Sequence, residues 1–294
     1  MAVRKKASKQ AKAAGPSGRK PGQPPAGVLT HADVMSAALR PDQELQRRSQ
    51  LLWEDRSRPT RGPKAAYAPD DVVQAATAIA DEDGGLAAVT MQAVSARLGL
   101  TTMAVYRYFP SKETLYDAII DAGMGLPPRP SVPPDEWRAE VTRWAHAKRD
   151  MMCARPWLAE LPFVAAPHGP NWLAWLEGLA APLYRAGFRG ELLGQMLSVV
   201  DGYTRGASDT SISLSRARAR GMTEQQWGAA VGADLGRAIG DPRYPAFASI
   251  LTAAPQGRPR NMQESFDFGL QRVLDGIALY IASGELASTS AHGA

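Results

Sequence analysis

The chain has 294 residues and a mass of 31.5 kDa, which is enough for one large domain or two ordinary ones. It contains no run of about eighteen uncharged apolar residues, so we expect no membrane partner. A single cysteine, Cys153, excludes an internal disulfide and any zinc site built from several cysteines. The basic start MAVRKKASKQAKAAGPSGRK lacks the apolar segment of a secretory signal, and we therefore expect a cytoplasmic location.

The positive charge is concentrated at the start of the chain. Residues 1–64 carry 14 Lys and Arg against 5 Asp and Glu, whereas residues 65–125 carry 3 against 8. A basic arm attached to a folded unit is typical of nucleic-acid binders, because Lys and Arg bind phosphates and release counterions. For residues 1–28, a merely solubilising tail is the alternative.

The first 66 residues read as a tail followed by an extension. Residues 1–28 have almost no large apolar groups, so we expect a disordered basic tail. Residues 29–66 form the extension, with a possible helix from Thr30 to about Glu54 that Pro41 divides. The stretch RSRPTRGPK, residues 56–64, then reads as an extended basic arm because its prolines and glycine oppose a helix.

Residues 67–125 predict a small domain of short helices. The first helix starts at Pro69 with two aspartates at its positive end and stops at Gly84-Gly85. Thr90 caps a second helix, MQAVSARL, which Gly99 ends. A third helix, capped by Thr101 or Thr102, runs to Phe109, and Ser111 caps a fourth. From Met91 to Phe109 the order is therefore helix, short turn, helix, which is the spacing of a helix-turn-helix.

The predicted third helix has one apolar face and one face suited to DNA. A shared seam would hold it down, formed by Val94, Leu98, Leu100, Val105 and Phe109. Its other face would present Thr102, Met103, Tyr106, Arg107 and Tyr108. Threonine hydroxyls bond base edges or phosphates, Met and Tyr contact thymine methyls, and Lys112 can hold a phosphate. The alternative is that the tyrosines are core edges and the threonines are only caps.

The remainder of the chain is predicted to be helical. A proline-rich connector, LPPRPSVPPDE, begins at residue 126 and marks our domain boundary. Beyond it, apolar residues recur at helical spacing over 135–153, 156–164, 171–187, 191–218, 223–239 and 264–282, with a short helix at 245–251. Strand-like alternation is absent, so we expect an all-α fold with a regulatory and dimerisation domain over 126–285 and a flexible C-terminus, 286–294.

Two adjacent stretches resemble a known family. The stretch LAAVTMQAVSARLGLTTMAVYRYFPSKETLYDAIIDA, residues 86–122, and the preceding YAPDDVVQAATAIADEDGG resemble the N-terminal domain of TetR-type bacterial transcriptional regulators. The resemblance implies that Thr102, Met103 and Tyr106 read bases and that Thr90, Tyr108 and Lys112 contact phosphates. Ala104 stands where many members have a hydroxyl or a glycine. Thr101 and Arg107 complete our candidate set on this unit.

The segment before the first of these helices also resembles part of a subset of the family. LLWEDRSRPTRGPK is similar to an extension in actinobacterial-looking members. Such an arm would place Arg58, Arg61 and Lys64 beside the helix-turn-helix, where they could enter the minor groove or follow phosphates. We expect the arm to supply much of the nonspecific affinity for DNA.

Regulators of this resemblance are homodimers that bind a small molecule in a helical C-terminal domain. Two apolar stripes give independent support for a four-helix dimer interface. They comprise Leu192, Leu193, Met196 and Val200 in one helix and Phe266, Leu270, Val273, Leu274, Ile277 and Tyr280 in another. Packing inside one chain is the alternative.

Aromatic and methionine side chains gather in the C-terminal half and suggest a ligand pocket. Our candidate contacts are Trp144, His146, Arg149, Met152, Trp175, Met196 and Tyr203, and Asp201 or Arg205 could add a polar group. Core filling is the alternative for each of them. The four histidines are too dispersed to suggest a metal site, and we expect no cofactor.

These observations predict a ligand-responsive repressor that binds a near-palindromic double-stranded DNA operator as a homodimer and is released by a small-molecule effector. A nonspecific architectural DNA-binding protein is one rival, although the large C-terminal half argues against it. A helical enzyme is the other rival, but the sequence has no nucleophile elbow, phosphate-binding loop or metal-spaced cluster.

Overall fold

The structure is a computed structural model that describes residues 43–53, 67–82, 84–130, 136–160, 168–253, 262–283 and 286. The chain divides into two compact units, residues 1–44 and 45–294, and the account below concerns the second. Every regular element in the described ranges is a helix, which confirms the predicted all-α fold. None of these helices is long and apolar enough to cross a membrane.

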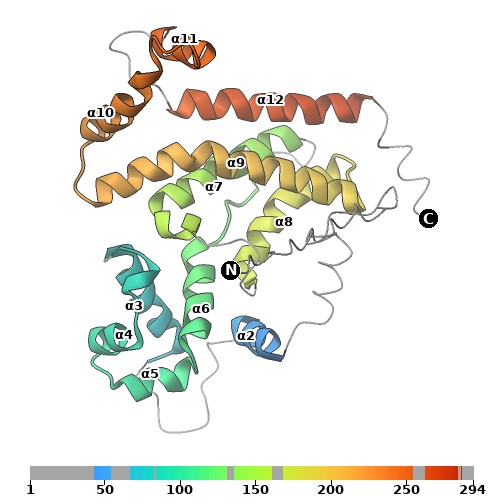
Figure 1. Cartoon of the computed structure of the whole chain (residues 1–294). Helices are drawn as coiled ribbons and strands as arrows, with labels where there is room; N and C mark the ends of the chain where they lie inside the picture. Colours follow the sequence, from blue (N-terminus) through green and yellow to red (C-terminus); the bar gives the residue numbers. More distant parts are fainter. Residues whose placement is uncertain are drawn as a thin grey trace, which may run out of the picture. The chain divides into compact units, whose positions relative to one another are not determined.

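The described helices fall into two groups in chain order (Figure 1). The N-terminal group comprises α2 (Gln43–Trp53), α3 (Pro69–Glu82), α4 (Met91–Leu98), α5 (Thr102–Tyr108) and α6 (Lys112–Met124). The C-terminal group comprises α7 (Trp137–Ala154), α8 (Pro170–Arg185), α9 (Gly190–Ala219), α10 (Glu224–Leu235), α11 (Pro245–Ala253) and α12 (Met262–Ala282). Three 3₁₀ turns, η1 (Leu86–Ala88), η2 (Pro156–Glu160) and η3 (Gly236–Ala238), lie between them.

Side-chain caps define the starts of α4, α5 and α6. The hydroxyls of Thr90, Thr101 and Ser111 each accept a hydrogen bond from a backbone N–H in the first turn of the helix that follows. Gly99 ends α4 in the left-handed conformation, with a φ of 65° that only glycine adopts freely. The predicted second, third and fourth helices of this domain are thereby confirmed, and Thr101 is the residue that caps the third.

The apolar seam between α4 and α5 forms from four of its five predicted members, and Leu100 is half-buried outside this core. Val94, Val105 and Phe109 are buried, and Leu98 packs half-buried against the same core. Residues of α3 and α6 complete this core, including Val72, Leu115 and Ile119. Burial of these side chains on one side of α5 leaves its other side facing outward.

In the C-terminal group, α9 packs against α7 and α8 on one side and against α12 on the other (Figure 1). The hydroxyl of Tyr203 on α9 donates to the carbonyl of Phe266 on α12 at 2.7 Å. Gly269 makes this approach possible, since a Cβ there would lie 2.3 Å from the Tyr203 hydroxyl oxygen. The two long helices are therefore joined within one chain.

This packing corrects part of the predicted dimer interface. Five of the ten candidates lie in the core of a single chain with at most 3% of their surface exposed: Val200, Phe266, Leu270, Leu274 and Ile277. The other five, Leu192, Leu193, Met196, Val273 and Tyr280, are half-buried against that core. The stripes were assigned to a partner because periodicity identifies a buried face but not the surface that buries it. The outward faces of α9 and α12 carry Val199, Phe268 and Leu279 instead.

Two predicted helices differ in extent. The stretch 156–164 forms only the five-residue η2, and residues 161–167 lie outside the described ranges. The stretch 223–239 divides into α10 and η3, where glycines at 228, 232 and 236 lower helix propensity. The predictions for residues 1–42, for the basic arm 56–64 and for residues 287–294 concern segments outside the described residues.

Helix α2 is held to α6 by a buried ion pair that the sequence did not predict. Arg48 donates from Nε and Nη2 to the two carboxylate oxygens of Asp117, both at 2.7 Å. Asp117 is only 3% exposed, and this burial raises the pKa of its carboxyl even though Arg48 favours the charged form. Leu52, also on α2, is buried in the hydrophobic core.

Replacing Arg48 should therefore destabilise the protein. We expect Arg48→Met to lower the free energy of unfolding by about 3 kcal/mol at neutral pH, because it leaves the Asp117 carboxylate buried without a cation. The loss should shrink as the pH falls, since the raised pKa of Asp117 means that its carboxyl is protonated early and then needs no partner. Urea unfolding measures both effects. Arg47→Met, at an exposed position of the same helix, is the control, and an equal loss in both variants would contradict the assignment.

Candidate functional site

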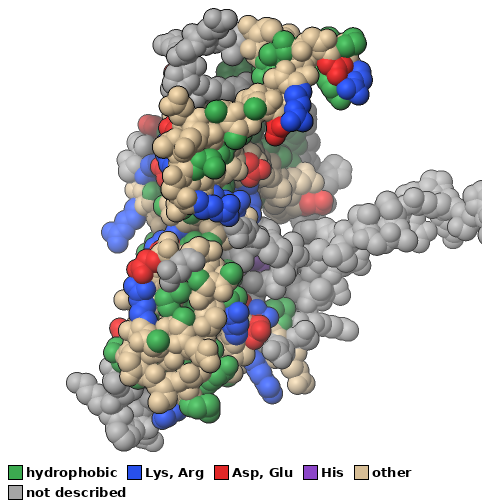
Figure 2. Space-filling model, turned by 60° about the vertical axis from the view of Figure 1, so that its left-hand side comes forward, with side chains coloured by type: hydrophobic (Ala, Val, Ile, Leu, Met, Phe, Trp, Pro, Cys, Tyr) green, Lys and Arg blue, Asp and Glu red, His purple; other side chains and the backbone are tan. Residues whose placement is uncertain are grey.

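The outward face of α5 carries large side chains that no core covers. Met103 is 70% exposed and Tyr106 is 40% exposed, and Arg107 on the next position is exposed as well. At the end of the molecule that carries α4 and α5, hydrophobic and basic side chains both reach the surface (Figure 2). An exposed methionine and tyrosine beside an arginine form a surface that can contact base edges and phosphates.

The threonines of this unit have structural roles that leave chemistry available. Thr90 and Thr101 use their hydroxyl oxygens to cap α4 and α5, so each O–H remains able to donate to a phosphate. Thr102 is half-buried, with its hydroxyl 3.4 Å from that of Ser95. The capping alternative that the sequence left open therefore describes Thr90 and Thr101 without removing them from the candidate interface.

The tyrosines differ from one another. Tyr108 is half-buried and its hydroxyl donates to the carbonyl of Tyr67 at 3.0 Å, while the Tyr67 hydroxyl donates to the carbonyl of Leu98 at 2.8 Å. These bonds join the start of α3 to α4 and α5. Tyr108 is thus a core-edge residue, whereas the exposed Tyr106 has no comparable bond among the described residues.

Lys112 lies at the exposed start of α6. Its ammonium lies 4.9 Å from the centre of the Tyr116 ring, and contact with Tyr116 raises the pKa of this lysine, so it stays charged. The Tyr116 hydroxyl is itself fixed by the carbonyls of Leu86 and Val89. A positioned cation beside α5 suits a phosphate. The arm residues Arg58, Arg61 and Lys64 lie outside the described residues.

The far end of α6 is bonded to α8. The carboxylate of Asp121 accepts hydrogen bonds from the backbone N–H groups of Asn171 and Trp172, at 3.2 and 2.9 Å, in the first turn of α8. A carboxylate at the N-terminus of a helix accepts hydrogen bonds from its free N–H groups and interacts favourably with the positive end of the helix dipole. Gly169 makes room for it, because a Cβ there would lie 2.3 Å from the Asp121 carboxyl carbon. The indole of Trp175 adds bonds to the carbonyls of Met124 and Gly125.

A cavity of about 90 Å³ lies between α7, α8 and α9. Its walls combine tryptophans, leucines and a few polar groups: Trp144, Lys148, Trp172, Trp175, Leu176, Leu179, Leu197, Ser198 and Asp201. Lys148 is only 4% exposed, and its ammonium lies 5.8 and 5.2 Å from the ring centres of Trp144 and Trp175. It makes no hydrogen bond or ion pair within the described residues, and Asp201 Oδ1 is buried there without a hydrogen-bond partner.

Burial controls the charge of this lysine. Removal from water lowers the pKa of Lys148 to about 8, and the positive charge of Arg205 acts in the same direction. The carboxylate of Asp201 opposes both effects. Lys148 therefore stays mainly charged at neutral pH, in a place where a charge is costly.

Only two of the seven predicted ligand contacts, Trp144 and Trp175, line this cavity. The other five lie elsewhere: His146 pairs with Asp267, Arg149 lies over the Phe266 ring, Tyr203 bonds to α12, Met152 is buried, and Met196 is half-buried. Lys148 was missed, although it follows Trp144 by four residues and so shares its helix face. Asp201 was named in the sequence as a possible polar group and lies in the wall.

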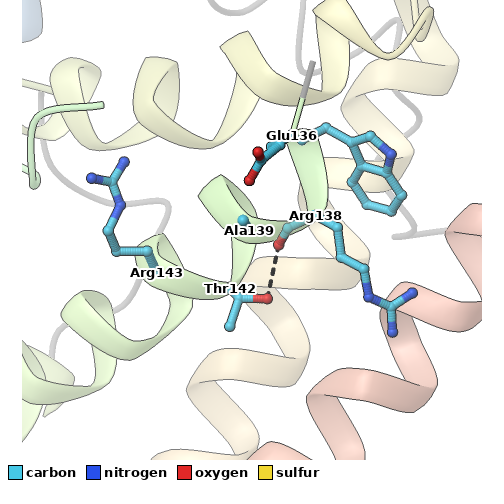
Figure 3. A pocket seen from close by; sticks show the side chains of 6 residues that line it. Glu136, Arg138, Ala139, Thr142 and Arg143 are labelled. Carbon is cyan, nitrogen blue, oxygen red and sulfur yellow. Dashed lines mark hydrogen bonds between the residues drawn. The ribbon is translucent and has the colours of Figure 1, made fainter. Parts of the chain in front are cut away.

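A wider hollow of about 540 Å³ lies at the start of α7 (Figure 3). Its described lining comes from that helix and its preceding residue alone: Glu136, Trp137, Arg138, Ala139, Thr142 and Arg143. Arg138 is engaged by Gln271 and Asp275 of α12, and Thr142 donates to the Arg138 carbonyl. Because one helix cannot surround a ligand, the smaller cavity is the better candidate.

The two tyrosines of α5 should respond differently to removal of the hydroxyl. Tyr108→Phe should lower the free energy of unfolding by about 1 kcal/mol, because it leaves the Tyr67 carbonyl without its donor. Tyr106→Phe, at an exposed position, should leave stability unchanged. Urea unfolding of the two variants makes the comparison, and equal stabilities would show that Tyr108 has no structural role.

Replacing the buried lysine should stabilise the protein. Lys148→Met should raise the free energy of unfolding by about 3 kcal/mol at neutral pH, because the folded chain no longer holds an amine whose pKa is lowered from 10.5 to about 8. The gain should vanish as the pH rises from about 8 to about 10.5, where the unfolded lysine also loses its proton. Urea unfolding across this pH range tests it, with Lys112→Met as the exposed control. A gain in stability that does not change with pH would contradict its assignment to the lowered pKa of Lys148.

Comparisons with known proteins place this geometry in one family. A family model described as "Bacterial regulatory proteins, tetR family" matches residues 74–119, which cover most of α3, all of α4 and α5 and part of α6. A second model, "Tetracyclin repressor-like, C-terminal domain", matches residues 129–281. Together they span the candidate interface and the cavity.

Two relatives are regulators of the same class, and one solved structure has a similar fold. The chain is 32% identical over 247 residues to the HTH-type transcriptional repressor DrrR1 of Streptomyces coeruleorubidus, covering 81% of this chain and 87% of that protein. It is 26% identical over 218 residues to an HTH-type transcriptional regulator of Saccharopolyspora erythraea, covering 73% and 86%. The fold is similar to that of apo ActR from Streptomyces coelicolor, with a TM-score of 0.61, 19% identity and coverage of 76% and 100%.

The match over both halves, together with the exposed face of α5, assigns the chain to a class of DNA-binding regulators rather than enzymes. The protein belongs to the TetR family of bacterial transcriptional regulators.

Proposed function

We propose that the protein is a repressor that binds a near-palindromic operator as a homodimer and is released by a small-molecule effector. The observation that carries the DNA-reading part is the capped helix α5, which is held by a buried seam and presents Met103 and Tyr106 to solvent. Apolar side chains are seldom left exposed without a function when they stand together on one short helix. Repression is supported by the 32% identity to a protein named as a repressor.

The positions along α5 suit base reading. Recognition helices contact base edges with residues near their N-terminal end, where Met103 lies on the second residue of α5 and Tyr106 one turn later. Both side chains suit thymine methyl groups, while Arg107 and Lys112 suit phosphates. Thr90 and Thr101 extend this surface with hydroxyl donors.

The second copy of the chain is proposed to pack on the outward faces of α9 and α12. Phe268 and Leu279 on α12 are 67% and 73% exposed, and Val199 on α9 is exposed as well. Glycines at 194, 202 and 206 lie on the exposed side of α9 and would allow close approach of a partner helix. A two-fold dimer then presents two copies of α5 to half-sites about 34–36 Å apart.

The junction between α6 and α8 supports a route for the effector. The bonds from Asp121 to the start of α8 join the helix that underlies α5 to a helix that lines the cavity. An effector that favours one placement of α8 would thereby bias the placement of α5. The ligand lowers DNA affinity only by its differential affinity for the two placements.

Selection of bound fragments from the source genome by the purified full-length protein tests the DNA-reading part. We expect enrichment of a near-palindromic site, and we expect Tyr106→Ala to lose that enrichment because the exposed ring no longer contacts bases. Tyr244→Ala, at an exposed tyrosine beside α11, is the matched control and should retain the site. Binding without any enriched sequence would favour the architectural alternative.

The basic arm should determine much of the salt dependence of DNA binding. Replacing Arg58, Arg61 and Lys64 with alanine should reduce the slope of log affinity against log salt by up to about 3, since each phosphate contact contributes about 0.9. Deleting residues 1–64 would be a poor test, because it also removes Arg48 and Leu52 from the core. A triple alanine variant at Lys5, Lys6 and Lys9 is the control, and an unchanged slope in the arm variant would refute the arm's role.

A further inference from the structure

The cavity between α7, α8 and α9 holds two polar groups that the fold leaves without partners. Lys148 is almost fully buried and forms no ion pair or hydrogen bond with any described residue. Asp201 Oδ1, in the wall formed by α9, is buried and accepts no hydrogen bond from them. Among the described residues, the buried carboxylates Asp117 and Asp121 are both hydrogen-bonded, whereas Asp201 Oδ1 is not.

Stability does not explain the pair. The Lys148 amine and Asp201 Oδ1 both lose hydration, and the contacts of the ammonium with the rings of Trp144 and Trp175 replace only part of it. A methionine of similar length would fill the space of Lys148 between Trp144 and Trp175 without that cost. Groups of this kind are typical of sites that are completed by a ligand.

The walls indicate the shape of the missing partner. Indole rings from two helices, Trp144 on α7 with Trp172 and Trp175 on α8, line the cavity together with leucines. Trp144 and Trp175 stand edge to face, with ring centres 6.0 Å apart. Flat aromatic surfaces of this kind favour another planar ring. The cavity of about 90 Å³ is smaller than sites for drug-sized ligands, so it suits the head of a molecule, on the scale of one ring.

The two charged groups of the wall indicate the partner's chemistry. Lys148 is the cation among the described lining residues and Asp201 is the anion. A ligand that offers a matching group to each of them is therefore favoured. The ammonium of Lys148 can donate to an anionic oxygen, whereas Asp201 Oδ1 needs a donor.

We propose that this cavity binds the head group of a planar aromatic acid that also carries a hydroxyl. The acid oxygen accepts a hydrogen bond from the Lys148 ammonium, the hydroxyl donates to Asp201 Oδ1, and the ring lies against Trp144 and Trp175. The claim that this ligand is the effector rests on the proposed function, whereas the claim that it binds in the cavity does not. It would contact α8 at Trp172 and Trp175, which both bond to the end of α6.

Binding of simple probes to the full-length protein tests the chemistry. The probes are 3-hydroxybenzoate, which has both groups too far apart to bond to each other, benzoate, which lacks the hydroxyl, and phenol, which lacks the acid. Quenching of tryptophan fluorescence reports binding because three tryptophans line the cavity, and calorimetry confirms the stoichiometry. We expect 3-hydroxybenzoate to bind about tenfold more tightly than either of the others, with one site per chain.

Two variants assign the contacts. Lys148→Met should weaken binding of 3-hydroxybenzoate and benzoate by about tenfold and leave binding of phenol unchanged. Asp201→Leu should weaken binding of 3-hydroxybenzoate and phenol but leave binding of benzoate unchanged. His146→Leu, at a residue outside the cavity, is the control, and thermal unfolding of every variant verifies that it is folded. A second lysine variant, Lys148→Arg, should retain part of the affinity for the acids if charge is what matters.

The outcomes separate this inference from the proposed function. Absence of saturable quenching by all three probes up to about 10 mM, or equal losses in Lys148→Met and in the control, would overturn the inference and indicate that water fills the cavity. Loss of DNA binding at a fragment from the genomic selection is measured separately with the same probes. Probe binding that follows the variant pattern without DNA release would support the site and contradict its role as the effector switch.

Discussion

Two buried carboxylates on α6, one turn apart, set the position of that helix. Asp117 and Asp121 lie at i and i+4 on one face, and a buried charge is tolerated only when it is paired or hydrogen-bonded. Asp117 is satisfied by Arg48 from α2, and Asp121 by the free N–H groups at the start of α8. Since neither partner lies on α6 or beside it in sequence, the helix fits in one place, and the seam that holds α5 is fixed with it.

The same constraint connects the two functional regions. Leu115 and Ile119, on the adjoining face of α6, fill the core beneath α4 and α5, while Asp121 holds the helix that brings Trp172 and Trp175 to the cavity. A shift of α8 that breaks the bonds from Asp121 would leave its carboxylate buried and unpaired. A shift that keeps them must carry the end of α6 along, so the bonded junction favours joint movement of the cavity wall and the DNA-reading face.

The features that could be predicted from the sequence are those set by interactions between residues close together in the chain. The starts of α4, α5 and α6 were readable because a capping hydroxyl and the amide it serves are three residues apart. The pairing of Arg48 with Asp117 spans 69 residues, and no local pattern indicates it. Periodicity correctly identified Phe266, Leu270 and Leu274 as an inward stripe, but it does not record whether the covering surface belongs to the same chain or to another.

The residues of the cavity also differ in how far the sequence could indicate them. Trp144 and Trp175 were selected because aromatic residues line pockets and cores alike, and the structure puts them in both settings at once. Lys148 was passed over because a lysine in a helix is normally a solvated residue. Its position inside the fold contradicts that expectation. Because a buried charge of this kind does not stabilise the protein, ligand binding is the better explanation for its presence. We therefore base the proposed site on the costly residue rather than on the well-packed ones.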